Sequence, residues 1–158
     1  MTNYSDRILT LLGSVERPGM DDVIKYLKTS NYFKRGCYSH HKEYARDGSG
    51  GGLACHSLEV YDYMVEHASG LDAESILVAA LFHDLGKTRR SDGRGHGARS
   101  IDILDECGLA LTDAERIAIG RHHDKSVSFV TCPLRRVLSL GDCFSTGRWK
   151  RAHRRPRP

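Results

Sequence analysis

A run of apolar residues in this chain ends in two side chains of types that bind metal ions. The segment ALFHDLGKTRR, residues 80–90, places His83 directly before Asp84. In an apolar helix, each of two polar side chains without a partner would cost about 1–3 kcal/mol. The pair therefore predicts a buried partner, and a metal ion would satisfy both groups because imidazole and carboxylate are common metal ligands.

Other histidines recur at intervals that suit pairs of antiparallel helices. His56 precedes His83 by 27 residues, and His96 precedes His122 by 26. Either interval has room for a helix, a turn and a return, so two helical hairpins could bring four imidazoles to one point, as helical bundles do in their metal sites. A mixture of imidazole and carboxylate favours Mn, Fe, Co, Ni or Zn, whereas purely carboxylate sites favour Mg or Ca.

The adjacent pair also indicates a second ion. Neighbouring residues on a helix point about 100° apart, so His83 and Asp84 cannot share one line of approach. A bridging carboxylate resolves this difficulty, because His83 would bind one ion while Asp84 reaches another.

Basic side chains near the pair are candidates to hold an anion. Lys87 follows His83 by four residues and Asp84 by three, so in a continuing helix it would share their face. Its ammonium group, and the guanidinium group of Arg99 three residues after His96, could bind a phosphate oxygen. Three loop residues either add positive potential at the mouth of the site or form a solvated basic loop: Arg89, Arg90 and Arg94.

Glu59 has two interpretations that the sequence leaves open. It follows His56 by three residues on the same predicted helix. Its carboxylate could therefore orient the imidazole by accepting a hydrogen bond from it, as groups around metal ligands often do. It could equally be an exposed helix charge.

All these side chains fall on predicted helices or next to their ends. Periodic apolar residues predict helices over residues 6–15, 21–29, 53–68, 72–86, 98–107, 111–123 and 133–145. Asp72 is expected as an N-cap, and Thr112 with Glu115 as a capping box. No segment alternates as a strand would, so the sequence predicts an all-α fold, a single bundle of about six to seven helices. Residues 31–52 form a polar and aromatic loop that could act as a lid.

Length and composition fit one soluble globular domain. Of the 158 residues, 39% are hydrophobic and 28% charged. No run approaches the roughly 20 apolar residues of a membrane helix, so no membrane partner is expected. The N-terminus lacks a secretory pattern, and the five scattered cysteines suit free thiols in a reducing compartment. We therefore expect a cytoplasmic protein.

The positive net charge of the chain comes from its C-terminal end. Residues 148–158, RWKRAHRRPRP, hold six of the 24 Lys and Arg residues and no acidic residue. The other 18 basic residues face 20 acidic ones, a balance of −2. A basic tail can contact phosphates, but a disordered, solvated end is the interpretation we favour. We divide the chain into a domain over 1–147 and a basic tail over 148–158, and we do not expect a nucleic-acid partner.

Three segments together resemble the HD-domain superfamily of metal-dependent phosphohydrolases. They are GGLACHSLEVYDYM, LFHDLGKT and LSLGDCF, and the resemblance covers residues 50–145. A His-Asp dipeptide alone is a weak signal. An upstream His-Ser-Leu, a Gly-Lys after the pair and a distal Gly-Asp make the combination specific. The resemblance implies that a first metal ion is bound by His56, His83, Asp84 and Asp142, with Asp84 bridging to a second ion.

Further histidines resemble the ligands of the binuclear branches of this superfamily. Those branches include the HD-GYP cyclic-dinucleotide phosphodiesterases and the diiron oxygenases. The resemblance implies that His96 and His122 are ligands, and that His123 is a neighbour of the site or a substrate contact. The segment HHDKSVSF stands where HD-GYP proteins carry their Gly-Tyr-Pro signature, which argues against cyclic di-GMP as the substrate.

The activity implied by the resemblance is hydrolysis of a phosphomonoester or phosphodiester by a metal-activated water. The substrate would be a small phosphate ester, in particular a nucleotide. Asp84 and Lys87 would be catalytic, and Lys87, Arg99 and His123 would contact the substrate. One or two divalent ions would be the cofactor: Fe, Mn, Ni, Co, Zn or Mg. Two alternatives stay open, a diiron oxygenase that cleaves a C–C or C–P bond and a non-catalytic nucleotide-binding module. The oligomeric state is also open.

Overall fold

The computed structural model describes residues 4–34, 51–124 and 131–152. These residues form seven α-helices and one 3₁₀-helix, with no strand among them. The elements are α1 (Tyr4–Leu12), α2 (Met20–Thr29), α3 (Gly52–His67), α4 (Ala73–Phe82), η1 (Leu85–Thr88), α5 (His96–Glu106), α6 (Asp113–Gly120) and α7 (Pro133–Ala152). The prediction of an all-α fold is confirmed.

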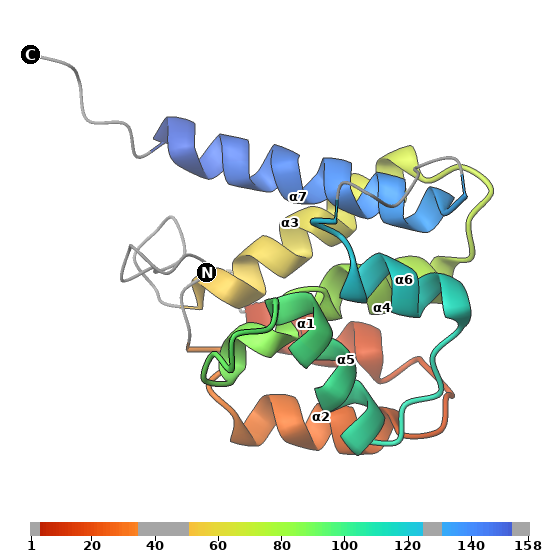
Figure 1. The fold of residues 1–158 in the computed structure, drawn as a ribbon, viewed down its shortest axis with the longest axis vertical. Coiled ribbons are helices and arrows are strands. Elements are labelled where there is room, and N and C mark those ends of the chain that lie inside the picture. The colour runs from red at the N-terminus through yellow and green to blue at the C-terminus, as the bar shows by residue number, and fades with distance from the viewer. Residues whose placement is uncertain (1–3, 35–50, 125–130, 153–158) are drawn as a thin grey trace, which may run out of the picture.

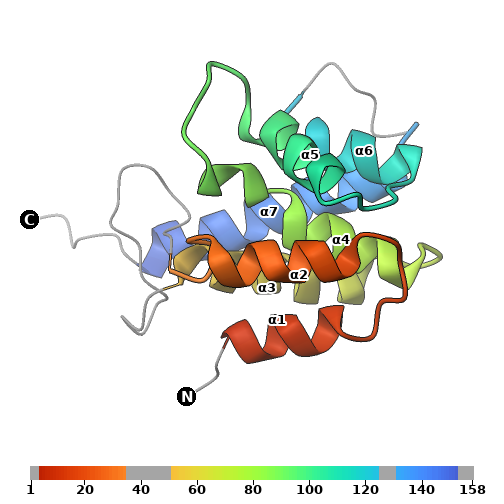
Figure 2. The same cartoon turned by 90° about the horizontal axis from the view of Figure 1, so that it is seen from below.

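The helices pack around α4, whose residues 76–82 are all buried. This helix contacts α3, α6 and α7, which explains why its sequence is apolar on every side. In Figure 1, α7 (blue) runs alongside α3 (yellow), and α2 (orange) lies at the opposite side of the molecule. Figure 2 shows α5 and α6 together, on the side opposite to α1. Buried apolar residues from Ile8 to Leu138 form one continuous core.

Local sequence rules account for two of the helix starts. The carboxylate of Asp72 accepts a hydrogen bond from the Ser75 amide at 2.7 Å, so Asp72 is the N-cap of α4. At α6, Thr112 and Glu115 form the expected capping box, with reciprocal bonds of 3.2 and 2.9 Å. Both predicted caps are confirmed.

The boundaries of several elements differ from those predicted. α4 ends at Phe82, and the chain then tightens into η1 instead of continuing as one helix to residue 86. α5 begins two residues earlier than predicted, so that His96 is its first residue. α7 continues to Ala152. The backbone of residues 148–152 is therefore helical, and the division of the chain at residue 147 stays a prediction.

The loop predicted over residues 31–52 begins inside the core. Tyr32 is fully buried, and its hydroxyl donates a hydrogen bond to the Leu81 carbonyl at 2.8 Å. Residues 35–50, which carry the rest of the predicted lid, lie outside the described residues, as do residues 153–158 of the predicted tail.

Candidate metal centre

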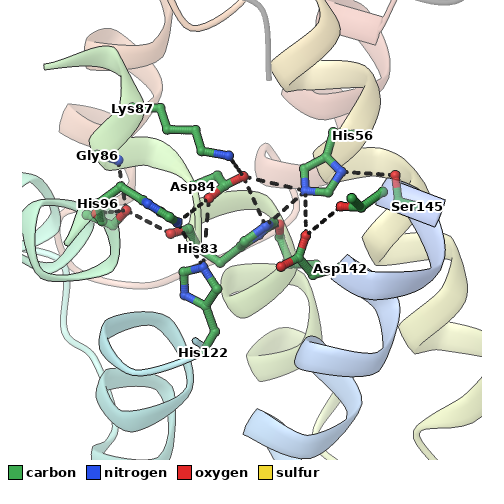
Figure 3. Close-up of polar contacts among 12 residues, drawn as sticks. His56, His83, Asp84, Gly86, Lys87, His96, His122, Asp142 and Ser145 are labelled. Carbon is green, nitrogen blue, oxygen red and sulfur yellow. Dashed lines mark hydrogen bonds and ion pairs between the residues drawn. The ribbon is translucent and has the colours of Figure 1, made fainter. Parts of the chain in front are cut away.

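Six helical elements bring the predicted ligands to one place in the bundle (Figure 3). α3 carries His56, α7 carries Asp142, and His83 and Asp84 occupy the joint between α4 and η1. His96 opens α5, and His122 follows the end of α6. All of these residues are buried except His96, which is partly exposed.

One group of ligand atoms gathers around the imidazole of His56. Its Nε2 atom lies 3.2 Å from Nε2 of His83 and 3.2 Å from Oδ1 of Asp142. Oδ2 of Asp84 lies 3.5 Å from that same His56 nitrogen and 3.4 Å from the His83 nitrogen. Two imidazole nitrogens and two carboxylates thus converge, as a transition-metal site requires.

A second group forms around His96 and His122. Their Nε2 atoms are 3.1 Å apart. Oδ1 of Asp84 lies 2.9 Å from the His96 nitrogen and 3.8 Å from the His122 nitrogen. The two oxygens of Asp84 therefore face different imidazole pairs, Oδ2 toward His56 and His83 and Oδ1 toward His96 and His122. This is the arrangement of a carboxylate that bridges two ions.

Hydrogen bonds on the far side of the rings orient the imidazoles. Nδ1 of His83 lies 2.9 Å from the Ala80 carbonyl, and Nδ1 of His122 lies 2.8 Å from the Ile119 carbonyl. A carbonyl oxygen can only accept, so in both rings Nδ1 carries the proton. In the neutral form of each ring, Nε2 is then left with a lone pair directed at the cluster, which is the state in which histidine binds a metal. The donor set therefore fits a metal ion.

The pKa values of Asp84, Asp142 and His122 all lie below their ordinary values, which favours the protonation states that bind a metal. Burial would raise the pKa of Asp84, but the charges of His83 and Lys87 outweigh it and hold this pKa well below its ordinary value. Asp142 behaves alike, because its 3.2 Å contact with the His56 ring overcomes its burial and holds its pKa well below the ordinary value. Burial, assisted by the charge of His83, lowers the pKa of His122 to about 3. Ionised carboxylates and neutral imidazoles are the metal-binding forms.

Lys87 reaches the cluster, although not in the way that the sequence predicted. The helix does not continue through it. Instead, the tighter winding of η1 brings Lys87 Nζ to 2.6 Å from Asp84 Oδ2. The ammonium group is partly exposed and Asp84 is buried, so Lys87 lies on the outer side of the carboxylate.

Arg99 and two arginines of the neighbouring loop contact carbonyl and carboxylate groups of the protein itself. The guanidinium group of Arg99 donates to the carbonyls of Gly86, at 3.2 Å, and of Arg94. Arg94 itself pairs with Asp102 at 2.6 Å, and Arg89 with Glu106. These contacts give the arginines a role in fastening the loop to α5. A contact between Arg99 and a substrate phosphate stays a prediction.

His123 lies at the rim of the site. Its side chain is 62% exposed, and its Nε2 is 3.7 Å from Oδ2 of Asp142. Its ring centre lies 4.1 Å from that of His122 and 5.2 Å from that of His96. The ring nitrogens of His96, His122 and His123 are also close enough together to hold one ion, so a substrate contact for His123 stays a prediction.

Sequence reasoning missed two serines that support the site. Ser100 receives a hydrogen bond from the Gly86 amide at 2.8 Å and lies 2.9 Å from the His83 carbonyl, which joins η1 and α4 to α5. Ser145 lies 2.9 Å from Nδ1 of His56. The only available signal was spacing, because Ser145 comes three residues after Asp142 and therefore shares its helix face.

An all-α bundle that gathers four imidazoles and two carboxylates has the donor set that helical bundles use to hold metal ions. A model of the HD-domain family matches residues 53–147, which is more than half of the chain. The chain belongs to the HD-domain family, and the resemblance seen in the sequence is confirmed. Comparisons with curated proteins and with solved structures gave no match. Among the described residues, no helix is both long enough and apolar enough to span a bilayer.

Proposed function

We propose that this protein is a metal-dependent phosphohydrolase that cleaves a phosphomonoester or phosphodiester, with a nucleotide or a related small phosphate ester as its substrate. The observation that supports this most is the position of Asp84, whose two oxygens face two separate pairs of imidazole nitrogens. A carboxylate in this position would hold two divalent ions side by side. Membership of the HD-domain family supports the same activity.

In this proposal one ion is held by His56, His83, Asp84 and Asp142, and the other by Asp84, His96 and His122. When bound, such ions supply Lewis acidity, which lowers the pKa of a water molecule and neutralises charge on phosphoryl oxygens. The buried carboxylates and neutral imidazoles keep the donors in fixed positions before any ligand arrives.

Two partly exposed side chains would bind the substrate. Lys87 places a positive charge beside Asp84, where it would hold a phosphate oxygen and favour anionic over neutral substrates. His123, at the rim, would contact the leaving group or the rest of the ester. The cytoplasmic location expected from the sequence stays a prediction.

Elemental analysis of protein purified without chelators, under anaerobic conditions, tests the binuclear site. We expect about two transition-metal ions per chain, falling to about one in His96→Ala, because that imidazole faces Oδ1 of Asp84 alone. The matched control is His67→Ala, which removes an exposed histidine of α3 and should keep both ions.

Turnover assays with the metal-loaded protein test the reaction. Release of phosphate or of a nucleoside from nucleotides, and cleavage of an aryl phosphodiester, should both depend on the metal. Oxygen consumption with bound iron and no phosphate release would favour the diiron oxygenase. Nucleotides that bind and remain intact with every metal would favour the non-catalytic module, and the absence of bound metal after reconstitution would contradict the site itself.

A further inference from the structure

A line of hydrogen bonds runs from the surface side of α3 to the candidate metal site. The hydroxyl of Ser145 donates to Oε2 of Glu59 at 2.6 Å. The same hydroxyl lies 2.9 Å from Nδ1 of His56. Figure 3 shows Ser145 next to the His56 ring, on the side away from Asp84. Ser145 is buried and Glu59 is partly buried, so water does not freely compete for these contacts.

The direction of these bonds follows from counting protons. A serine hydroxyl has one hydrogen to donate, and here that hydrogen goes to the carboxylate of Glu59. The bond between Ser145 and His56 must then run the other way, with Nδ1 of His56 as donor. Nε2 of His56 is thereby left to face His83 and the two carboxylates of the site.

The Nδ1 atom of His56 has a different kind of hydrogen-bond partner from the Nδ1 atoms of His83 and His122. Nδ1 of His83 and Nδ1 of His122 donate to backbone carbonyls, which are neutral. The line from His56 ends at a negatively charged side chain. A carboxylate beyond a ligating imidazole makes the ring more basic and a stronger metal ligand. The identity of Glu59 and Ser145 therefore bears on metal affinity as well as on ring orientation.

Close packing of α3 against α7 makes the line possible. Glu59 follows His56 by three residues on α3, and Ser145 follows Asp142 by three on α7, so each pair shares one helix face. At Gly141, an added Cβ would lie 3.2 Å from the Tyr63 ring and 3.3 Å from a Val60 methyl group. The absence of a side chain there lets α7 approach α3 closely enough for both contacts.

We propose that Ser145 is a positioning residue, which relays the charge of Glu59 to His56, fixes the proton of that imidazole on Nδ1 and strengthens its bond to the metal. The inference rests on the proposed metal site. It also resolves the two interpretations of Glu59, because the carboxylate acts on His56 through a hydroxyl of another helix instead of directly.

Zinc binding and NMR spectroscopy of the full chain test this relay. We expect Ser145→Ala to weaken Zn²⁺ binding by about 10–100-fold. Glu59→Gln, which keeps the shape of the side chain and removes its charge, should weaken it by about tenfold. The control Glu66→Gln removes the same charge from the same helix, at an exposed position seven residues away. The Zn²⁺ affinity of this control should stay within about twofold of that of the parent chain.

In the Zn²⁺-loaded parent, the His56 Nδ1 proton should exchange slowly with water. In Ser145→Ala this exchange should become fast, while the circular dichroism of the metal-free protein is unchanged.

The outcomes separate the relay from the metal site. If the parent and Ser145→Ala bind Zn²⁺ equally well, the relay is wrong and the metal site stands. Equal weakening in Glu59→Gln and Glu66→Gln would also overturn the relay, because the effect would then be one of overall charge. A parent chain that binds no Zn²⁺ would overturn both proposals. Glu59→Gln keeps the test decisive if Ser145→Ala does not fold.

Discussion

At the scale of single residues, His122 is a buried imidazole that the fold keeps neutral, which is the form in which it would bind the proposed metal. Its side chain is 1% exposed, and its Nδ1 proton is held by the Ile119 carbonyl. Burial is the main cause that lowers its pKa, and the neighbouring charge of His83 adds to the effect. In the folded, metal-free protein this group therefore resists protonation that the unfolded chain accepts.

We predict that the metal-free protein loses stability as the pH falls below about 6.5. The pKa of His122 is 6.5 ordinarily and about 3 in the fold, so between these values the unfolded state binds a proton that the folded state does not. The free energy of unfolding then falls with decreasing pH, by at most about 1.4 kcal/mol per pH unit for this group. Urea unfolding in a chelating buffer from pH 8 to pH 5 measures this slope.

Replacing the ring should reduce that dependence. His122→Leu is expected to unfold with a shallower slope, with a remainder from His123, whose pKa burial also lowers. His67→Ala, at an exposed position, should keep the slope of the parent. A slope in His122→Leu as steep as that of the parent would show that the pH dependence has another origin.

At the scale of elements, the second ligand pair depends on how closely α5 approaches α6. His96 opens α5 and His122 follows α6, so the contact between these helices sets the distance between the two imidazoles. Gly97 lies at this contact. A Cβ atom there would come within 2.6 Å of the Ile119 carbonyl oxygen and 2.9 Å of the Gly120 carbonyl oxygen. Both are backbone atoms, so the helices would have to move apart.

Gly97→Ala is therefore expected to lose the second ion and to keep the first. The helices α3 and α7, which carry His56 and Asp142, do not contain the substitution. Elemental analysis should give about one ion per chain. Gly95→Ala is the matched control, because an added Cβ at this residue meets no atom within 4 Å. Loss of both ions in Gly97→Ala alone would show that the two positions are not independent.

Local rules and spacing predicted much of this arrangement, and contacts between helices account for the rest. Asp72 and Thr112 act as caps through hydrogen bonds to backbone amides three residues further along the chain. Such short-range pairs can be recognised in the sequence alone. The His56–His83 and His96–His122 pairs follow from the lengths of helical hairpins. The end of α4 at Phe82 could not be predicted from the sequence, because no glycine or proline stands at that point. The roles of Ser100 and Ser145 depend on which helices touch, and helix periodicity does not carry that information.

At the scale of the whole molecule, a metal ion bound between several helices would stabilise the folded state. A ligand that binds the folded chain alone at 100 times its dissociation constant adds about 2.7 kcal/mol to the free energy of unfolding. For a chain of this size, that corresponds to a rise in Tm of at least about 5 °C. Thermal unfolding with excess Zn²⁺, and again after its removal by a chelator, should show this difference.

The variant Asp84→Asn should largely abolish the metal-dependent rise in Tm. The amide keeps the shape of the side chain but loses the charge shared by both groups of ligands. Metal-free parent and variant are compared first, because the lost pairing with Lys87 changes the baseline stability. A variant stabilised by Zn²⁺ as strongly as the parent would contradict a bridging role for Asp84.

The position of Asp142 on the last helix has a consequence for how the protein matures. The ribosome synthesises His56 well before Asp142, because 85 residues of chain lie between them. Their side chains come to lie 3.2 Å apart only after α7 packs on α3. A growing chain that has passed His122, just after α6, already holds the four imidazoles, but it lacks one of the two carboxylates of the first site. If the proposed site is right, a chain cut short before α7 would therefore hold the first ion less tightly than the full chain does.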